Sequence, residues 1–235
     1  METALTLYRL QQAELERADS ANRLVQVKAS LLDASRVDAA AATAQQSQTA
    51  LNKAQANARS LELEVQSVRT KLRNSQDRLF SGKVSNPKEL ASLQGESEAL
   101  GRRIAKLEDD LLEAMIALED AEEQHERAAA ALADATAQRE NEVSGLTAEQ
   151  AQLERRVAEL DTAIAQTRAS LAAEDMSLFD HLARRKANRP VALLSRSNVC
   201  GACGVSVPLS FASQARSHTE MAFCPSCERV LYSQG

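Results

Sequence analysis

Four cysteines are the residues of this chain whose type and spacing point most directly to chemistry. They form two Cys-x-x-Cys pairs, Cys200/Cys203 and Cys224/Cys227, separated by twenty residues, and the 235-residue chain has no other cysteine. Each pair can form a tight turn that points both sulfurs inward, so two turns complete a tetrahedron of thiolates. Zinc suits such a site because thiolates are soft ligands and the ion imposes no d-electron geometry. The spacing predicts one structural Zn²⁺ ion.

The four cysteines have other interpretations. Two disulfides are one, although cysteines crowded into one segment suit a metal site in a reducing cytoplasm better. A four-cysteine iron or iron–sulfur site is another, and a redox Cys-x-x-Cys pair is a third. His218 lies between the pairs, and we expect it at the surface or beside the site rather than as a ligand. Four protein ligands leave no open position for a substrate, so we expect a fold-stabilising metal and no enzyme.

The sequence before the cysteines predicts long helices. No glycine precedes Gly82 and no proline precedes Pro87, and apolar residues recur at alternating steps of three and four. Aromatic residues make up only 3% of the chain, which favours a coiled coil over a globular core. Turn-forming residues interrupt the pattern over 80–87. We therefore expect an antiparallel hairpin; a single long helix that dimerises in parallel is the alternative.

The predicted fold is mostly α, a long antiparallel two-helix coiled-coil hairpin followed by a small β zinc ribbon. The expected segments are a hairpin over 1–180 (helix 1 about 3–79, tip loop 80–87, helix 2 about 88–180), a connector over 181–198 and a C4 zinc ribbon over 199–235. Asn86 and Pro87 predict the N-cap and first position of helix 2, and 191–194 predicts a strand. The residues expected to supply the ribbon's sheet and core are Val205, Val207, Leu209, Phe211, Met221, Phe223, Val230, Leu231 and Tyr232.

Basic residues gather in two regions that are candidate binding surfaces. The candidate partner-binding tip comprises Arg78, Phe80, Lys83, Asn86 and Lys88. Phe80 is the only aromatic residue between Tyr8 and Phe179, and it either anchors a partner or folds back to cap the coil. The candidate basic surface of the connector and ribbon comprises Arg184, Arg185, Lys186, Arg189, Arg196 and Arg216. A solvated surface without a binding role is the alternative for both.

An acidic belt separates these two regions in the sequence. Residues 108–126 carry nine acidic side chains and no Lys or Arg. His125 falls on the apolar seam inside this belt. We expect it to be a polar position that fixes the register of the coil, with a pH sensor as the alternative.

The chain resembles a family of bacterial coiled-coil proteins with a C4-type zinc ribbon, long catalogued as a domain of unknown function. The resemblance rests on two stretches, Leu79-Phe80-Ser81-Gly82 with Asn86-Pro87-Lys88-Glu89-Leu90-x-x-Leu93-Gln94, and Cys224-Pro225-x-Cys227-x-Arg229-Val230-Leu231-Tyr232. The resemblance implies a helical hairpin with the ribbon at its base. Two departures are Glu228, where the family usually has glycine, and Arg189-Pro190, where a glycine turn is expected.

Resemblance and residues together favour a binding protein. We expect a non-enzymatic adaptor or chaperone-like protein that contacts protein partners through the tip and ribbon; some members of the family are associated with a sigma factor, secretion or flagellar components, or RNA. The alternative is a nucleic-acid (RNA or DNA) binding protein that uses the basic ribbon and connector. No stretch approaches 18 consecutive apolar residues and the N-terminus does not resemble a secretory signal, so we expect a cytoplasmic protein without membrane insertion.

Overall fold

The structure, a computed structural model, describes residues 3–217 and 220–233. The elements, in chain order, are α1 (Thr3–Leu32), α2 (Ser35–Phe80), α3 (Pro87–Ser170), α4 (Ala173–Arg185), β1 (Val191–Leu194), α5 (Leu209–Ser217), β2 (Ala222–Phe223) and β3 (Val230–Ser233). Long helices and a small C-terminal sheet confirm the predicted fold class. The chain divides into two compact units, residues 33–142 and the remainder, and each is described separately below.

Helix bounds differ from the sequence prediction in two places. One helix was expected over about 3–79, but α1 ends at Leu32 and α2 begins at Ser35. The Asp33 carboxylate accepts a hydrogen bond from the Ser35 backbone N–H at 3.0 Å, which offers the backbone a local partner outside the helix. The second helix was expected to reach about 180, but α3 ends at Ser170 and α4 follows an extended residue, Ala172.

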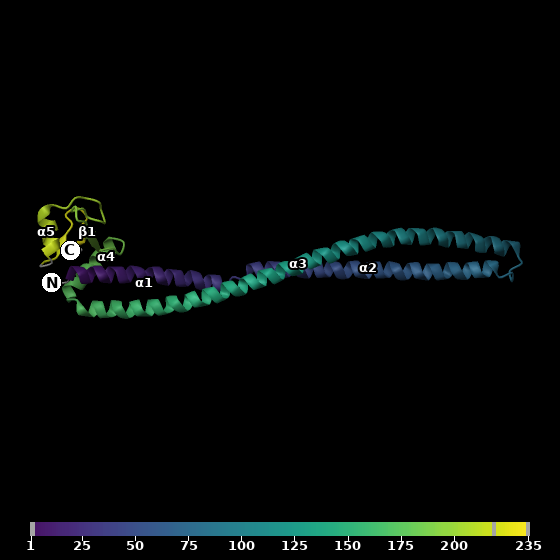
Figure 1. Cartoon of the computed structure of the whole chain (residues 1–235), viewed down its shortest axis with the longest axis horizontal. Coiled ribbons are helices and arrows are strands. Elements are labelled where there is room, and N and C mark those ends of the chain that lie inside the picture. Colours follow the sequence, from purple (N-terminus) through teal and green to yellow (C-terminus); the bar gives the residue numbers. More distant parts are fainter. Residues whose placement is uncertain (1–2, 218–219, 234–235) are drawn as a thin grey trace. The chain divides into compact units, whose positions relative to one another are not determined.

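In the unit formed by 33–142, α2 and the first part of α3 run antiparallel on either side of the loop (Figure 1). Val65 and Val68 of α2 pack against Ile104 and Leu107 of α3, and all four side chains are buried. Arg103 contacts Glu64 at 2.6 Å on the flank of this seam. Because the two helices of one chain bury each other's apolar seams, the hairpin is confirmed and the parallel-dimer alternative is wrong.

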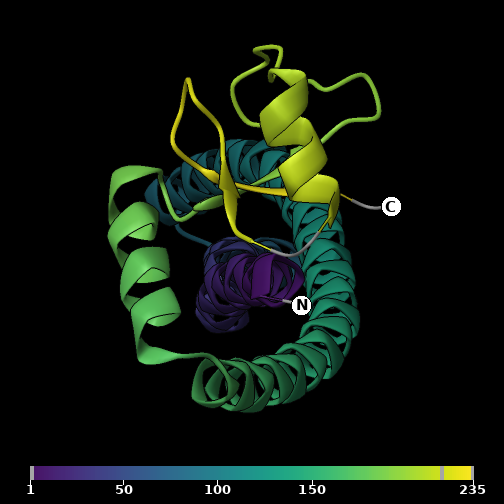
Figure 2. The same cartoon turned by 90° about the vertical axis from the view of Figure 1, so that its left-hand side faces the viewer.

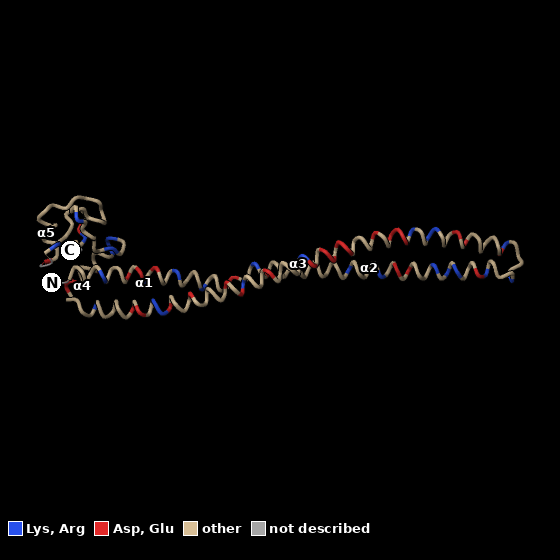
Figure 3. The backbone as a smooth tube through the Cα atoms, in the orientation of Figure 1, with Lys and Arg blue, Asp and Glu red and all other residues tan. Residues whose placement is uncertain are grey.

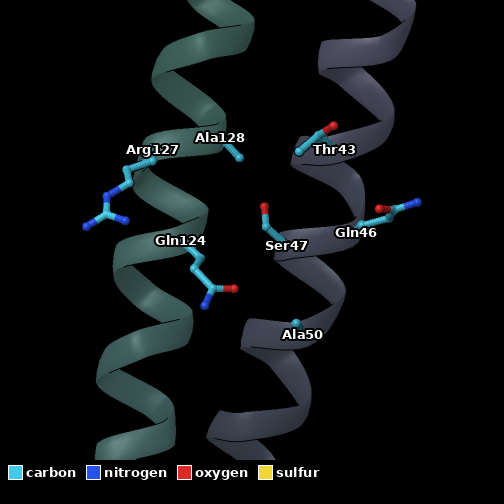
Figure 4. Close-up of a pocket in the computed structure, with 7 residues that line it drawn as sticks. All are labelled: Thr43, Gln46, Ser47, Ala50, Gln124, Arg127 and Ala128. Carbon is cyan, nitrogen blue, oxygen red and sulfur yellow. The ribbon is translucent and has the colours of Figure 1, made fainter.

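The seam becomes small and polar farther from the loop. Ala44, Ala128 and Ala135 are buried there, and such small side chains allow close helix approach with little apolar area. The Ser47 hydroxyl lies 3.2 Å from Nδ1 of the half-buried His125. The Ser47 side chain lies between the two helices in Figure 4, among residues that line a pocket. His125 therefore has a polar partner across the seam, which supports the register-fixing interpretation.

The second unit joins α1, the end of α3, α4 and the C-terminal module, defined here as β1, α5, β2, β3 and the two cysteine turns (Figure 2). Its sheet has the order β1-β3-β2, with β1 parallel and β2 antiparallel to β3. The prediction of a strand at 191–194 is confirmed, and this strand lies inside the segment expected to be a connector. Buried residues from two helices and two strands form one core here: Leu7, Leu10, Phe179, Leu182, Val191, Val230 and Tyr232. The start of α1 is therefore part of the C-terminal module's core.

Candidate metal centre

Two similar turns carry the cysteines. In the first, Gly204 N–H donates to the Cys200 carbonyl at 2.8 Å, and Cys200 N–H donates to the Val205 carbonyl at 3.0 Å. In the second, Glu228 N–H donates to the Cys224 carbonyl at 2.8 Å, and Cys224 N–H donates to the Arg229 carbonyl at 2.9 Å.

The residue after each second cysteine adopts a left-handed conformation, with φ of 73° at Gly204 and 62° at Glu228. Glycine adopts this conformation without strain, whereas a residue with a Cβ does so at a cost of roughly 1–2 kcal/mol. The departure from the family pattern at Glu228 is therefore accommodated by a strained backbone, and the second turn keeps the shape of the first.

The two turns bring the four sulfurs into one cluster. Cys200 and Cys227 sulfurs lie 3.8 Å apart, as do those of Cys203 and Cys224, and all four lie within 4.8 Å of one another. A bonded disulfide has sulfurs about 2.05 Å apart, so the cysteines are free thiols here. Four thiolates about 2.3 Å from a tetrahedral ion would stand about 3.8 Å apart. The cluster fits one tetrahedral metal ion.

The surroundings of Cys200 and Cys224 disfavour the thiolate form of both side chains. Burial raises the pKa of Cys200 to about 12, and burial also raises the pKa of Cys224. Burial acts in the same direction on Cys227, but hydrogen bonds from the backbone and side chain of Arg229 outweigh it and lower the pKa of Cys227 to about 7. A bound cation would supply the positive charge that the buried thiolates need, since metal ligation requires the deprotonated form.

Residues of the connector hold the second turn in place. Glu228 lies 3.6 Å from Arg185 and 3.5 Å from Lys186, and Arg229 donates from Nε to the Arg189 carbonyl at 2.7 Å. The turn before Pro190 contains no glycine; Ala187 and Asn188 instead adopt positive φ of 53° and 58°. The cluster is thereby linked to the end of α4 through a network of polar contacts.

Three of the six residues of the predicted basic surface have polar partners in the structure. Arg185 and Lys186 pair with Glu228, and Arg216 donates to Asn198 Oδ1 at 2.6 Å. Arg184, Arg189 and Arg196 are exposed, and within the described parts of the chain none of these three has an acidic side chain at salt-bridge distance. Arg216 keeps its charge because its partner is a neutral amide, and a single Glu228 carboxylate offsets only part of the charge of Arg185 and Lys186. The six-residue basic surface therefore stays a prediction.

The core of the C-terminal module also differs from the prediction. Val207, Val230, Leu231 and Tyr232 are buried as expected, but the exposed fraction is 74% for Leu209, 44% for Val205 and 37% for Phe223. Leu209 and Phe211 alternate with polar residues, a strand-like pattern, yet Pro208 precedes a helix, α5, which buries Ala212 and Ala215. His218 lies outside the described residues.

The predicted tip is the loop between α2 and α3. The Asn86 side chain accepts a hydrogen bond from the Lys88 backbone N–H at 3.0 Å, which confirms it as the N-cap of α3. Arg78 lies 3.5 Å from Glu89, and Lys83 and Lys88 are exposed. The Phe80 side chain, on the last residue of α2, is 81% exposed. The Phe80 side chain is therefore available to a partner and does not fold back to cap the coil.

Comparison with known proteins identifies the family to which this fold belongs. The model of the CT398-like coiled coil hairpin domain matches residues 9–187. The chain belongs to this family. CT398 from Chlamydia trachomatis is similar over 99% of this chain and 94% of its own, with a TM-score of 0.60 and 16% identity. A protein from Mycobacterium smegmatis is similar over 98% of this chain and 97% of its own, with a TM-score of 0.63 and 18% identity.

At these identities the likeness to the two solved structures shows a shared fold. No curated protein matches the sequence. In the described parts of this CT398-like chain, no helix is both long enough and apolar enough to cross a membrane.

Proposed function

We propose that this CT398-like protein is a non-enzymatic, cytoplasmic adaptor that binds protein partners through its hairpin tip. The exposed Phe80 is the observation that carries this proposal. A large aromatic side chain that is 81% exposed gains free energy when a partner buries it. Arg78, Lys83 and Lys88 surround it in sequence, so the fitting partner surface is an apolar pocket with an acidic rim.

The proposed metal is one Zn²⁺ ion held by the four cysteines. Sulfur separations of 3.8 Å fit tetrahedral thiolate coordination. Iron fits the same ligands, and metal analysis distinguishes the two. A four-thiolate site has no open position for substrate, and this supports a structural role for the ion. Its role would be to fold a short C-terminal module whose own apolar core is small.

The C-terminal module offers a second proposed contact surface for protein partners. Leu209 and Phe211 of α5 and Phe223 of β2 expose 74%, 38% and 37% of their area, and a partner that buried them would gain free energy. Arg184, Arg189 and Arg196 supply exposed positive charge in the same unit. An acidic partner would complement this module as well as the tip.

Charge reversal at the tip tests the proposal. The variant Lys83→Glu/Lys88→Glu is compared with Lys53→Glu/Lys106→Glu, which makes the same change in net charge at exposed positions outside the tip. Partners are captured by crosslinking from the native cytoplasm and identified with and without nuclease. The proposal predicts nuclease-resistant protein partners that the tip variant loses and the control variant keeps.

The same experiment tests the nucleic-acid alternative. Partners that disappear with nuclease, together with an affinity for RNA that falls steeply as salt rises, would indicate counterion release and contradict the adaptor proposal. Identical partner sets for the tip variant and the control would contradict the role of the tip.

A further inference from the structure

The acidic belt on α3 contains an exposed apolar ridge, defined here as Leu112, Met115 and Ile116. Their side chains are 60%, 54% and 63% exposed. At spacings of three and four residues they lie on one side of the helix. The apolar seam toward α2 is supplied by other residues, Leu107, Leu111 and Ala114, so the ridge is not used in packing the hairpin.

Acidic residues surround the ridge on the helix surface. The neighbours of Leu112 at three and four positions are Glu108, Asp109, Met115 and Ile116. The neighbours of Ile116 are Leu112, Glu113, Glu119 and Asp120. Every polar neighbour of the ridge at these positions is therefore a carboxylate. Figure 3 shows the acidic run on α3 near its label.

Few of these carboxylates are neutralised by the chain. Of the nine acidic residues in 108–126, Glu108 pairs with Arg69 and Glu123 pairs with Arg127. In the described residues, the other seven have no Lys or Arg within salt-bridge distance: Asp109, Asp110, Glu113, Glu119, Asp120, Glu122 and Glu126. Like charges on adjacent turns of a helix destabilise it slightly, so the seven unpaired carboxylates do not stabilise the hairpin.

We propose that the ridge and its acidic border are a docking surface for a basic amphipathic helix of a protein partner. Leucine-sized side chains of the added helix would cover the ridge, and Lys or Arg on its flanks would pair with the unpaired carboxylates that border it: Asp109, Glu113, Glu119 and Asp120. Met115 also lines a groove with Ala58 of α2 and Leu118 of α3, so a helix lying there contacts both helices of the hairpin. Because the belt is acidic, the partner helix is expected to be basic.

The same charges disfavour other occupants. Nucleic acid and anionic membrane surfaces are repelled by uncompensated carboxylates. A second copy that docked belt against belt would bring like charges together. A second copy that docked its basic tip on the belt remains as an outcome of the test. The surface is separate from the tip, so the proposal does not depend on the role of Phe80.

The probe for this surface is a fluorescent leucine–lysine peptide of about 18 residues, about five helical turns, with leucines at i, i+3, i+4 and i+7. Binding to the full-length protein is measured by anisotropy at about 0.15 M salt, where charge attraction between distant exposed groups is screened. A leucine–glutamate peptide with the same leucine positions is the charge control. We expect binding of the lysine peptide and none of the glutamate peptide.

The variant Leu112→Gln/Ile116→Gln removes the ridge while leaving the hairpin seam intact. We expect its affinity for the lysine peptide to fall roughly tenfold or more, because two large apolar contacts with the peptide are lost. Leu63→Gln is the matched control, since Leu63 is 57% exposed on α2 outside the belt. Leu63→Gln and Phe80→Ala should bind the peptide as the original chain does, and circular dichroism should show equal helix content in all variants.

Three outcomes would overturn the proposal. The first is no binding of the lysine peptide by the original chain. The second is equal binding by the ridge variant, which would show that charge alone or another site captures the peptide. The third is a dimer, seen by light scattering, that the ridge variant converts to a monomer, because a second copy would then be the occupant.

Discussion

Gln11 of α1 and Val191 of β1 are joined by a buried hydrogen bond: the side-chain oxygen of Gln11 accepts from the Val191 backbone N–H at 2.7 Å. The two residues are 180 positions apart in the sequence. Val191 is the first residue of an edge strand of the three-stranded sheet, and the glutamine takes the place of a missing neighbouring strand. The first helix therefore completes the hydrogen bonding of the C-terminal module.

Removing the Gln11 amide should destabilise this unit. Gln11→Ala leaves the Val191 N–H buried without a partner, which costs about 1–3 kcal/mol. Gln12→Ala, at an exposed neighbouring position, is the matched control and should change stability by less than about 0.5 kcal/mol. Urea unfolding, followed by the tyrosine signal, measures both free energies. Equal stabilities for the two variants would contradict the role of Gln11.

Tyrosine fluorescence offers a local probe of the same unit. The chain has two tyrosines and no tryptophan, and Tyr8 of α1 stacks on Tyr232 of β3 with ring centroids 5.1 Å apart. Removing the metal with a chelator should unfold the sheet and separate the rings, because the turn at Cys224 leads directly into β3. Far-ultraviolet circular dichroism should fall only slightly, since most of the helix lies in α1, α2 and α3.

A tyrosine signal that does not change when the metal is removed would contradict the metal's role in holding β3. Loss of most of the helical signal at the same chelator concentration would contradict the independence of the coiled coil from the metal. Re-addition of zinc should restore the original fluorescence.

Glu228 should be replaceable by glycine with a gain in stability. Glu228→Gly relieves roughly 1–2 kcal/mol of left-handed strain at φ 62°, and it loses exposed ion pairs to Arg185 and Lys186, which contribute about 0–1 kcal/mol. Glu228→Ala loses the same pairs but keeps the Cβ, so it should be less stable than the original chain. Thermal unfolding of the zinc-loaded proteins ranks the three. Glu228→Ala more stable than Glu228→Gly would contradict the strain argument.

The tip aromatic should be dispensable for folding. Because Phe80 is 81% exposed, Phe80→Ala should change the free energy of unfolding by less than about 0.5 kcal/mol while reducing partner capture. Leu63→Ala, another exposed apolar change on α2, serves as the control for capture. A destabilisation of more than about 2 kcal/mol would indicate that Phe80 packs on the coil, against the proposed anchor role.

The features that local sequence decides were predictable. The spacing of the four cysteines anticipated their cluster, and Asn86-Pro87 anticipated the start of α3, because turns and caps depend on neighbouring residues. The break at Asp33 was not predicted, because the residues around it favour a helix. Asp33 and Ser35 were the available signal, since a side-chain hydrogen bond between them competes with helical hydrogen bonding.

Features that depend on distant contacts were not predictable. Nothing in the sequence near Glu228 shows that Arg185 and Lys186 lie beside it, because these residues are far apart in the chain. The alternation around Leu209 and Phe211 resembled a strand, but the segment forms α5, whose Ala212 and Ala215 pack into the module's core. Packing against the rest of the module outweighs local strand preference there.

The central claim is that one zinc ion, held by the four cysteines, stabilises the C-terminal module. The metal content of the native protein tests this claim most directly. The chain is purified from its native cells without added metal and analysed by mass spectrometry for zinc, iron and free thiols. The account predicts one zinc per chain, close to zero iron, and loss of that zinc in Cys200→Ser, with Ser226→Ala, in the second turn, unaffected. Stoichiometric iron, or a metal-free protein with its cysteines paired as disulfides, would contradict it.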